Sequence, residues 1–172
     1  GITSLSIDHQ QQLGTSLDSI AKEKAGVMKK GIPVITVAQD PMAMKVLKAT
    51  ANSVHAPLHV TGGDIDFSYR FETSREHGPH TRICLTTSTS RFEHLRVPVH
   101  GTHMAINCGL ALAMLDKLKG SGFEIDTEKA TSGLDDVSLA GRMEMICRDP
   151  RVMIDGAHNA QSIRALIHAI GQ

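Results

Sequence analysis

The sequence predicts an α/β fold in which a parallel sheet is followed by an antiparallel region. Over residues 1–60, apolar strand-like runs alternate with amphipathic helical segments, which is typical of a doubly wound parallel sheet. This alternation stops at Gly62-Gly63, and strand-like segments without intervening helices follow up to residue 100. Two strand-like segments joined by the Asp149-Pro150 turn, followed by a helix, occupy the residues from 142 onward.

The first 60 residues contain the segments of the predicted parallel sheet. Strands are expected at residues 1–8, 32–37 and 58–60, and helices at 15–30 and 42–54. Thr15 is suited to cap the first helix, with Asp18 three residues later, and Gly31 fits its C-terminal end.

The remaining residues contain the predicted antiparallel region and a second domain. Strands are expected at 67–71, 82–85, 95–99, 142–146 and 152–154, and helices at 103–119, 128–134 and after Asn159. The turn-forming stretch 133–138 is the candidate boundary between a domain of residues 1–135 and another of residues 136–172.

Composition excludes several classes of protein. The 18 basic and 18 acidic residues balance, so charge does not favour binding to nucleic acid or an anionic membrane. No apolar run approaches the roughly 20 residues of a membrane span. Three widely spaced cysteines suit a reducing cytoplasm. Because the chain begins in a strand-like segment and stops in an apolar helical run, we expect a fragment of a longer protein.

Two features of the first 30 residues could bind a metal. Asp8-His9 ends a predicted buried strand, where ligands bind in open α/β sheets, although a plain turn would have the same sequence. Lys24 falls on the apolar stripe between Ile20 and Met28. A shielded amine can add carbon dioxide and become a carbamate, an oxygen ligand for Mg²⁺. Alternatively, the Lys24 side chain extends along the apolar surface into water.

Other residues could bind a nucleotide. The segment Asp155-Gly156-Ala157-His158-Asn159 lies between an apolar strand and a helix, and Asp155 could accept hydrogen bonds from a ribose or adenine. Asn107 could read an adenine edge and Arg142 could clamp a phosphate, although each could equally be an ordinary surface residue. The chain contains no G-x-x-x-x-G-K-[ST] phosphate loop.

These motifs, taken in order, resemble those of the folylpolyglutamate/dihydrofolate synthases of the Mur ligase superfamily. The resemblance covers nearly the whole chain. Its motifs are D-H at 8–9, L-G at 13–14, I-A-K-E-K-A-G at 20–26, D-x-D-F-S-Y at 64–69, H-x-x-x-N at 103–107, G-R at 141–142 and D-G-A-H-N at 155–159. Met104, Ala140 and Ala160 depart from the usual Gln, Pro and Pro of that family.

The resemblance implies an assignment for both predicted domains. Residues 1–135 would be the later part of a Mur-ligase central ATPase domain, and residues 136–172 the start of a Rossmann-like C-terminal domain. The implied site residues are His9 and carbamylated Lys24 as Mg²⁺ ligands, Asn107, Arg142 and Asp155 as ATP contacts, and Lys24 and His158 as catalytic residues, with His158 near the incoming glutamate.

The implied activity is ATP-dependent addition of glutamate to folates, to dihydropteroate, or to both, through an acyl phosphate. The parent would be a cytoplasmic monomer, and the chain alone is expected to be inactive because the phosphate loop would lie outside it. Two alternatives stay open. One is another Mur-type amide ligase, such as a cell-wall peptide ligase, and the other is an inactive nucleotide-binding fragment.

Overall fold

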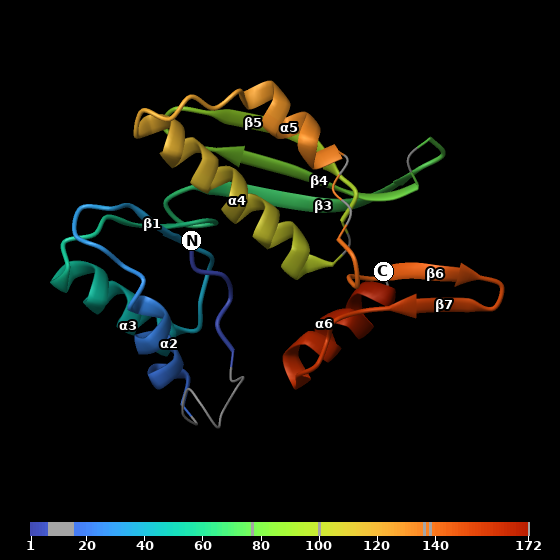
Figure 1. The fold of residues 1–172 in the computed structure, drawn as a ribbon, viewed down its shortest axis with the longest axis horizontal. Helices are drawn as coiled ribbons and strands as arrows, with labels where there is room; N and C mark the ends of the chain where they lie inside the picture. Colours follow the sequence, from blue (N-terminus) through green and yellow to red (C-terminus); the bar gives the residue numbers. More distant parts are fainter. Residues whose placement is uncertain (7–15, 77, 100, 136, 138, 172) are drawn as a thin grey trace. The chain divides into compact units, whose positions relative to one another are not determined.

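The structure, a computed structural model, describes residues 1–6, 16–76, 78–99, 101–135, 137 and 139–171 (Figure 1). These residues form two compact units, each assembled from separated stretches of the chain. The first unit comprises Gly1–Ser68, Cys84–Glu93 and Ile106–Ile125, and the second comprises Tyr69–Ile83, His94–Ala105 and Asp126–Gln172. The predicted α/β class, with parallel and antiparallel sheets, is confirmed.

The first unit contains the parallel sheet. Strands β1 (Val34–Thr36) and β2 (Leu58–Val60) pair in parallel, and Ile2 forms a parallel bridge to Thr36. The strand expected at residues 1–8 is therefore reduced to this bridge over the described residues 1–6. Asp8, His9 and Thr15 lie outside the described residues.

Two capped helices cover the parallel strands. Ser16 caps α2 (Leu17–Ala25) through its hydroxyl, and Asp40 caps α3 (Pro41–Ser53) by accepting a 2.8 Å hydrogen bond from the backbone N–H of Met42. Their buried faces join the strands in an apolar core that includes Ile2, Ala25, Met28, Val34, Leu47 and Ala51. Burial of this face gives the helices most of their stability.

The prediction that Lys24 lies on a buried face is wrong. Helix α2 ends at Ala25 rather than near residue 30, so Lys24 lies in its last turn instead of midway along an apolar stripe. The buried face of α2 consists of Ile20, Ala21 and Ala25, and Lys24 is exposed among the described residues. Its long side chain therefore reaches water, as in the alternative interpretation of the stripe.

The antiparallel region is a three-stranded sheet. Its strands, β3 (Asp66–Ser74), β4 (Gly78–Thr86) and β5 (Arg91–Val97), are neighbours in chain order. Short connections join them, as hairpins require. On β4 the side chains of Ile83 and Leu85 are fully buried. This alternating burial is what a sheet with one covered face shows.

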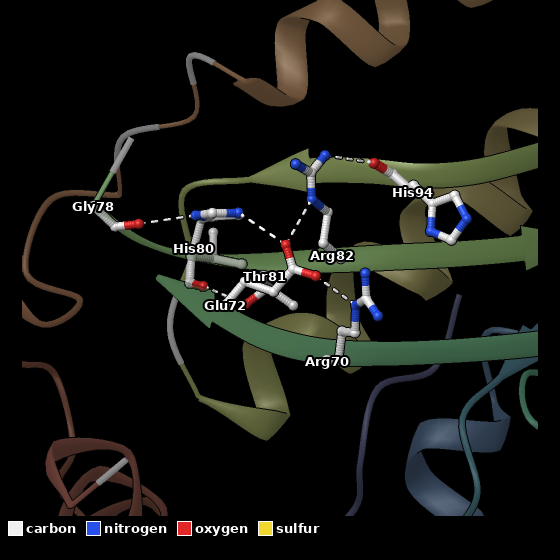
Figure 2. A network of polar contacts seen from close by, with 8 residues as sticks. Arg70, Glu72, Gly78, His80, Thr81, Arg82 and His94 are labelled. Carbon is white, nitrogen blue, oxygen red and sulfur yellow. Dashed lines mark hydrogen bonds and ion pairs between the residues drawn. The ribbon is translucent and has the colours of Figure 1, made fainter. Parts of the chain in front are cut away.

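A polar network ties the three strands together (Figure 2). The Glu72 carboxylate on β3 accepts a 3.0 Å hydrogen bond from Arg82 Nε on β4 and pairs with Arg70. Buried His80 places its Nε2 3.4 Å from the same carboxylate, and Arg82 Nη1 donates to the His94 carbonyl on β5. The hydrogen bond from Arg82 lowers the pKa of the Glu72 carboxyl below its ordinary value. The network therefore pins the register of the strands.

Helix α4 (Thr102–Gly120) follows the sheet and confirms the helix expected at 103–119. Within the first unit, the Phe67 ring of β3 packs against the backbone of α4 at Gly109, where no side chain intervenes. Helix α5 (Thr127–Asp135) confirms the helix expected at 128–134. Among the described residues, no helix is both long and apolar enough to cross a membrane.

The last part of the second unit is a hairpin followed by a helix. Strands β6 (Glu144–Arg148) and β7 (Arg151–Ile154) pair antiparallel, and α6 (Ala160–Ile170) follows. Strand β6 begins two residues later than expected because Gly141 and Met143 have positive φ angles of 67° and 49°. Such angles lie outside the extended region that regular strands adopt.

Candidate functional site

A cavity of about 240 Å³ lies within the second unit, between the start of α4 and the loops that flank the β6–β7 hairpin. Its polar lining groups come from His103, Arg142, Glu144 and Asp155. Its apolar lining comes from Pro98, Val99, Met104, Val137, Leu139 and Met143. Polar groups that converge on one hollow are found in many small-molecule sites.

Asp155 directly follows β7 and joins the two loops at the cavity. Its Oδ2 accepts a 2.9 Å hydrogen bond from the backbone N–H of Met143, and its Oδ1 accepts a 2.7 Å bond from that of Ala157. The loops also meet directly, because the Gly156 N–H donates to the Gly141 carbonyl at 2.7 Å. Asp155 is half-buried, so these bonds are partly shielded from water.

Arg142 lies between the two residues with positive φ in this turn. A Cβ placed on Gly156 would lie 3.5 Å from Arg142 Nη1 and 3.6 Å from its Cζ, so the guanidinium lies against Gly156. The side chain is exposed, and no ion pair or hydrogen bond joins the guanidinium to another described residue. Within the part of the chain that the structure describes, the donors of Arg142 are therefore available to an anionic group.

His103, in the first turn of α4, lines the same cavity. Its Nδ1 is buried and lacks a hydrogen-bond partner among the described residues. Burial lowers the pKa of the His103 imidazole, Asp155 opposes that shift, and the charge of Arg142 adds to it. The ring is therefore neutral at pH 7. The sequence identifies His103 only as part of the H-x-x-x-N motif at 103–107, whose four-residue spacing puts His103 and Asn107 on one helix face.

His158 lies in the turn between β7 and α6, beside the cavity loops. Its Nδ1 is 2.8 Å from the Gly156 carbonyl oxygen, and its ring is exposed. Asn159 caps α6: its Oδ1 accepts from the Ser162 N–H at 2.8 Å, and Ser162 Oγ accepts from the Asn159 N–H at 3.0 Å. The capping box fixes the turn that carries His158.

The structure brings together only some of the predicted site residues. Arg142 and Asp155 line one cavity, with His158 in the adjoining turn. Asn107 is half-buried on α4 and belongs to the first unit, as does exposed Lys24. His9 lies outside the described residues. Within the described ranges, no group of three or more His, Cys, Asp or Glu side chains could hold a metal ion.

Proteins similar to this chain are enzymes of folate metabolism. The chain is 30% identical over 173 residues to a dihydrofolate synthase/folylpolyglutamate synthase of Bacillus subtilis. The aligned region covers 99% of this chain and 39% of that protein. It is 32% identical over 177 residues to the enzyme of the same description from Mycobacterium tuberculosis, covering 98% of this chain and 36% of that protein. No protein-family profile matches the chain.

Solved structures agree with these relatives. An FPGS–AMPPCP–folate complex matches with a TM-score of 0.89 at 28% identity, over 99% of this chain and 41% of that one. A Mycobacterium tuberculosis folylpolyglutamate synthase complexed with ADP and AMPPCP matches with a TM-score of 0.83 at 28% identity, over 99% and 38%. The chain thus spans about two-fifths of the length of the relatives that it matches.

Proposed function

We propose that this chain, which belongs to the folylpolyglutamate/dihydrofolate synthase family, is part of an ATP-dependent ligase that adds glutamate to folates. The observation that carries the proposal is the cavity shared by Arg142 and Asp155, in a fold that matches an AMPPCP–folate complex. The chain spans well under half of its relatives, so the complete reaction needs further polypeptide.

Within this proposal the cavity binds part of ATP. The guanidinium of Arg142, which pairs with none of the described residues, binds a phosphate, and apolar side chains such as Leu139 contact the base or ribose. Besides the two hydrogen bonds that it accepts from backbone N–H groups, the Asp155 carboxylate has lone pairs that could accept hydrogen bonds from the ribose hydroxyls or the adenine amino group. Asn107, which belongs to the first unit, is proposed separately as an ATP contact on the basis of the family motif. These assignments are supported by the order of the residues in the family motifs.

The proposed reaction passes through an acyl phosphate. The carboxylate of the folate substrate, or of dihydropteroate, attacks the γ-phosphorus of ATP, and ADP leaves. The amine of glutamate then attacks the acyl carbon, phosphate leaves and the amine loses a proton. Arg142 offsets negative charge on the transferring phosphoryl group. His158, on the turn fixed by the α6 capping box, would lie near the incoming glutamate.

Mg²⁺ is part of the proposal, with His9 and a carbamate on Lys24 as ligands. Mg²⁺ would neutralise charge on the phosphates when bound. The described residues fit this assignment only in part, because they include no ready-made group of ligands and Lys24 is exposed. Exposure of Lys24 removes the shielding on which the carbamate was argued, so the proposal rests on the family motif at 20–26 and on His9.

We also propose that residues 136–172 begin a second domain, as the sequence predicts. The support is apolar side chains left exposed among the described residues. The exposed fractions of these side chains are 56% for Ile146, 46% for Ile163, 65% for Ile167 and 59% for Ile170. Exposed apolar side chains gathered in one short segment are typical of a surface that packs against further structure. A cytoplasmic location and a monomeric parent remain proposals that rest on the family assignment.

Replacing Arg142 by Ala tests the nucleotide assignment. We expect AMPPCP to bind between about ten and a hundred times more weakly, since a hydrogen bond to a charged group contributes about 1.5–3 kcal/mol. NMR chemical-shift titration of the chain measures the affinity. Arg148→Ala removes the same charge from the exposed face of β6 and should leave binding unchanged. Equal affinities for wild type and Arg142→Ala would contradict the assignment.

Replacing Lys24 by Met tests the carbamate. In an enzyme extended to the full length of its relatives, loss of the Mg²⁺-binding oxygen should abolish most ATP- and glutamate-dependent turnover. Lys22→Met is the matched control, because Lys22 is also exposed on α2 and, among the described residues, pairs with Asp18. Near-normal turnover of Lys24→Met would eliminate the carbamate and leave a lysine that only extends into water.

A further inference from the structure

We propose that Asp155 is a positioning residue: it holds the turn at Gly141–Met143 closed and so places the Arg142 guanidinium at the cavity. The inference rests on the proposed nucleotide site and assigns Asp155 a role that does not require contact with the nucleotide.

The carboxylate of Asp155 is shared between two backbone segments. One oxygen accepts from Met143 N–H across a separation of 12 residues, and the other accepts from Ala157 N–H within its own turn. Both bonds have a charged acceptor, which makes them stronger than bonds between neutral groups. A single side chain therefore joins the turn before β6 to the turn after β7.

The turn before β6 needs such a bond because its backbone is strained. Met143 has φ of 49°, in the left-handed region that residues with a side chain disfavour. Gly141 has φ of 67°, which glycine adopts readily. The bond from Asp155 ends on the N–H of Met143, the residue that carries the strain.

Closure of this turn determines where Arg142 points. Arg142 stands between Gly141 and Met143, and its guanidinium lies against Gly156. The Gly156 N–H donates to the Gly141 carbonyl at 2.7 Å, which holds the two turns together. If Met143 relaxed to a negative φ, the peptide plane between Arg142 and Met143 would rotate relative to β6 and carry the Arg142 side chain away from Gly156.

Amide hydrogen exchange of Gly156 reports whether the turns are joined. We expect Asp155→Asn to speed that exchange about tenfold. The Asn side chain has one acceptor oxygen instead of two, so it cannot accept from the N–H groups of both Met143 and Ala157 as the carboxylate does. Adding Met143→Gly to this variant should slow the exchange again by at least about threefold, because glycine adopts the positive φ without the bond.

A matched control separates this rescue from a general effect of glycine. His55 is also a non-glycine residue with positive φ, 56°, and it lies in the first unit at the end of α3. His55→Gly should leave Gly156 exchange unchanged in both backgrounds. The proposal fails if Asp155→Asn leaves Gly156 exchange unchanged, or if Met143→Gly slows it no more than His55→Gly does.

AMPPCP binding gives a second measurement. If Asp155 acts by positioning Arg142, the chain with Asp155→Asn and Met143→Gly should bind AMPPCP several times more tightly than the chain with Asp155→Asn alone. Equal affinities would mean that Asp155 acts only by direct contact and would overturn the positioning role. The exchange experiment contains no nucleotide. A wild-type chain that fails to bind AMPPCP while exchange behaves as expected would therefore contradict the proposed function and leave the positioning role supported.

Discussion

Gly109→Ala is expected to lower the free energy of unfolding by about 2–3 kcal/mol, although alanine ordinarily stabilises a helix. A Cβ at this position would lie 2.6 Å from Cδ2 and 2.7 Å from Cζ of the Phe67 ring. The ring can avoid it only by leaving the face of α4, which exposes apolar surface that is now covered. Urea denaturation followed by circular dichroism measures the change.

Two further variants make this prediction specific to the contact. Gly133→Ala, in α5, meets no atom within 4 Å and should raise stability by up to about 1 kcal/mol. In a Phe67→Ala background the clash is absent, so Gly109→Ala should become neutral or stabilising. If Gly109→Ala destabilises both backgrounds equally, Phe67 is not the cause.

Asp116→Asn is expected to cost about 2 kcal/mol at pH 7, because hydroxyl donors lose a charged acceptor. Asp116 on α4 is 3% exposed and accepts a 2.7 Å hydrogen bond from Thr89 Oγ1. Burial raises the pKa of its carboxyl, but hydrogen bonds from Ser90, Thr89 and Thr87 outweigh burial and hold the pKa below its ordinary value. This carboxylate therefore anchors the β4–β5 connection.

The pH dependence follows from the direction of that shift. A carboxyl with a lowered folded-state pKa stabilises the protein above its unfolded-state pKa of about 4, and this contribution is lost as pH falls through the folded-state pKa. The difference in unfolding free energy between wild type and Asp116→Asn should thus be full at pH 7 and shrink below about pH 4. Glu124→Gln, an exposed site in the same unit, removes the same charge and should show little difference at either pH. A pH-independent difference would mean that the Asp116 carboxylate is not the anchor.

The order of helices and strands could be predicted from the sequence because it depends on neighbouring residues. Apolar periodicity placed α3, β2 and α4 within a residue or two, and the strands expected at 142–146 and 152–154 correspond to β6 and β7. The stretch 155–159 was also recognisable, since a strand, a polar turn and a helix cap are adjacent in the chain.

What only the tertiary structure decided involves residues far apart in the chain. Apolar periodicity placed Lys24 on the apolar stripe of the first helix. In the structure α2 ends at Ala25, and the Lys24 side chain is exposed. Spacing does not reveal that Gly109 must lack a side chain because of Phe67, or that His103, Arg142 and Asp155 line one cavity. The positive φ of Met143 is likewise invisible in the sequence, because it depends on contacts with residues far away in the chain, such as the bond that Asp155 accepts from the Met143 N–H.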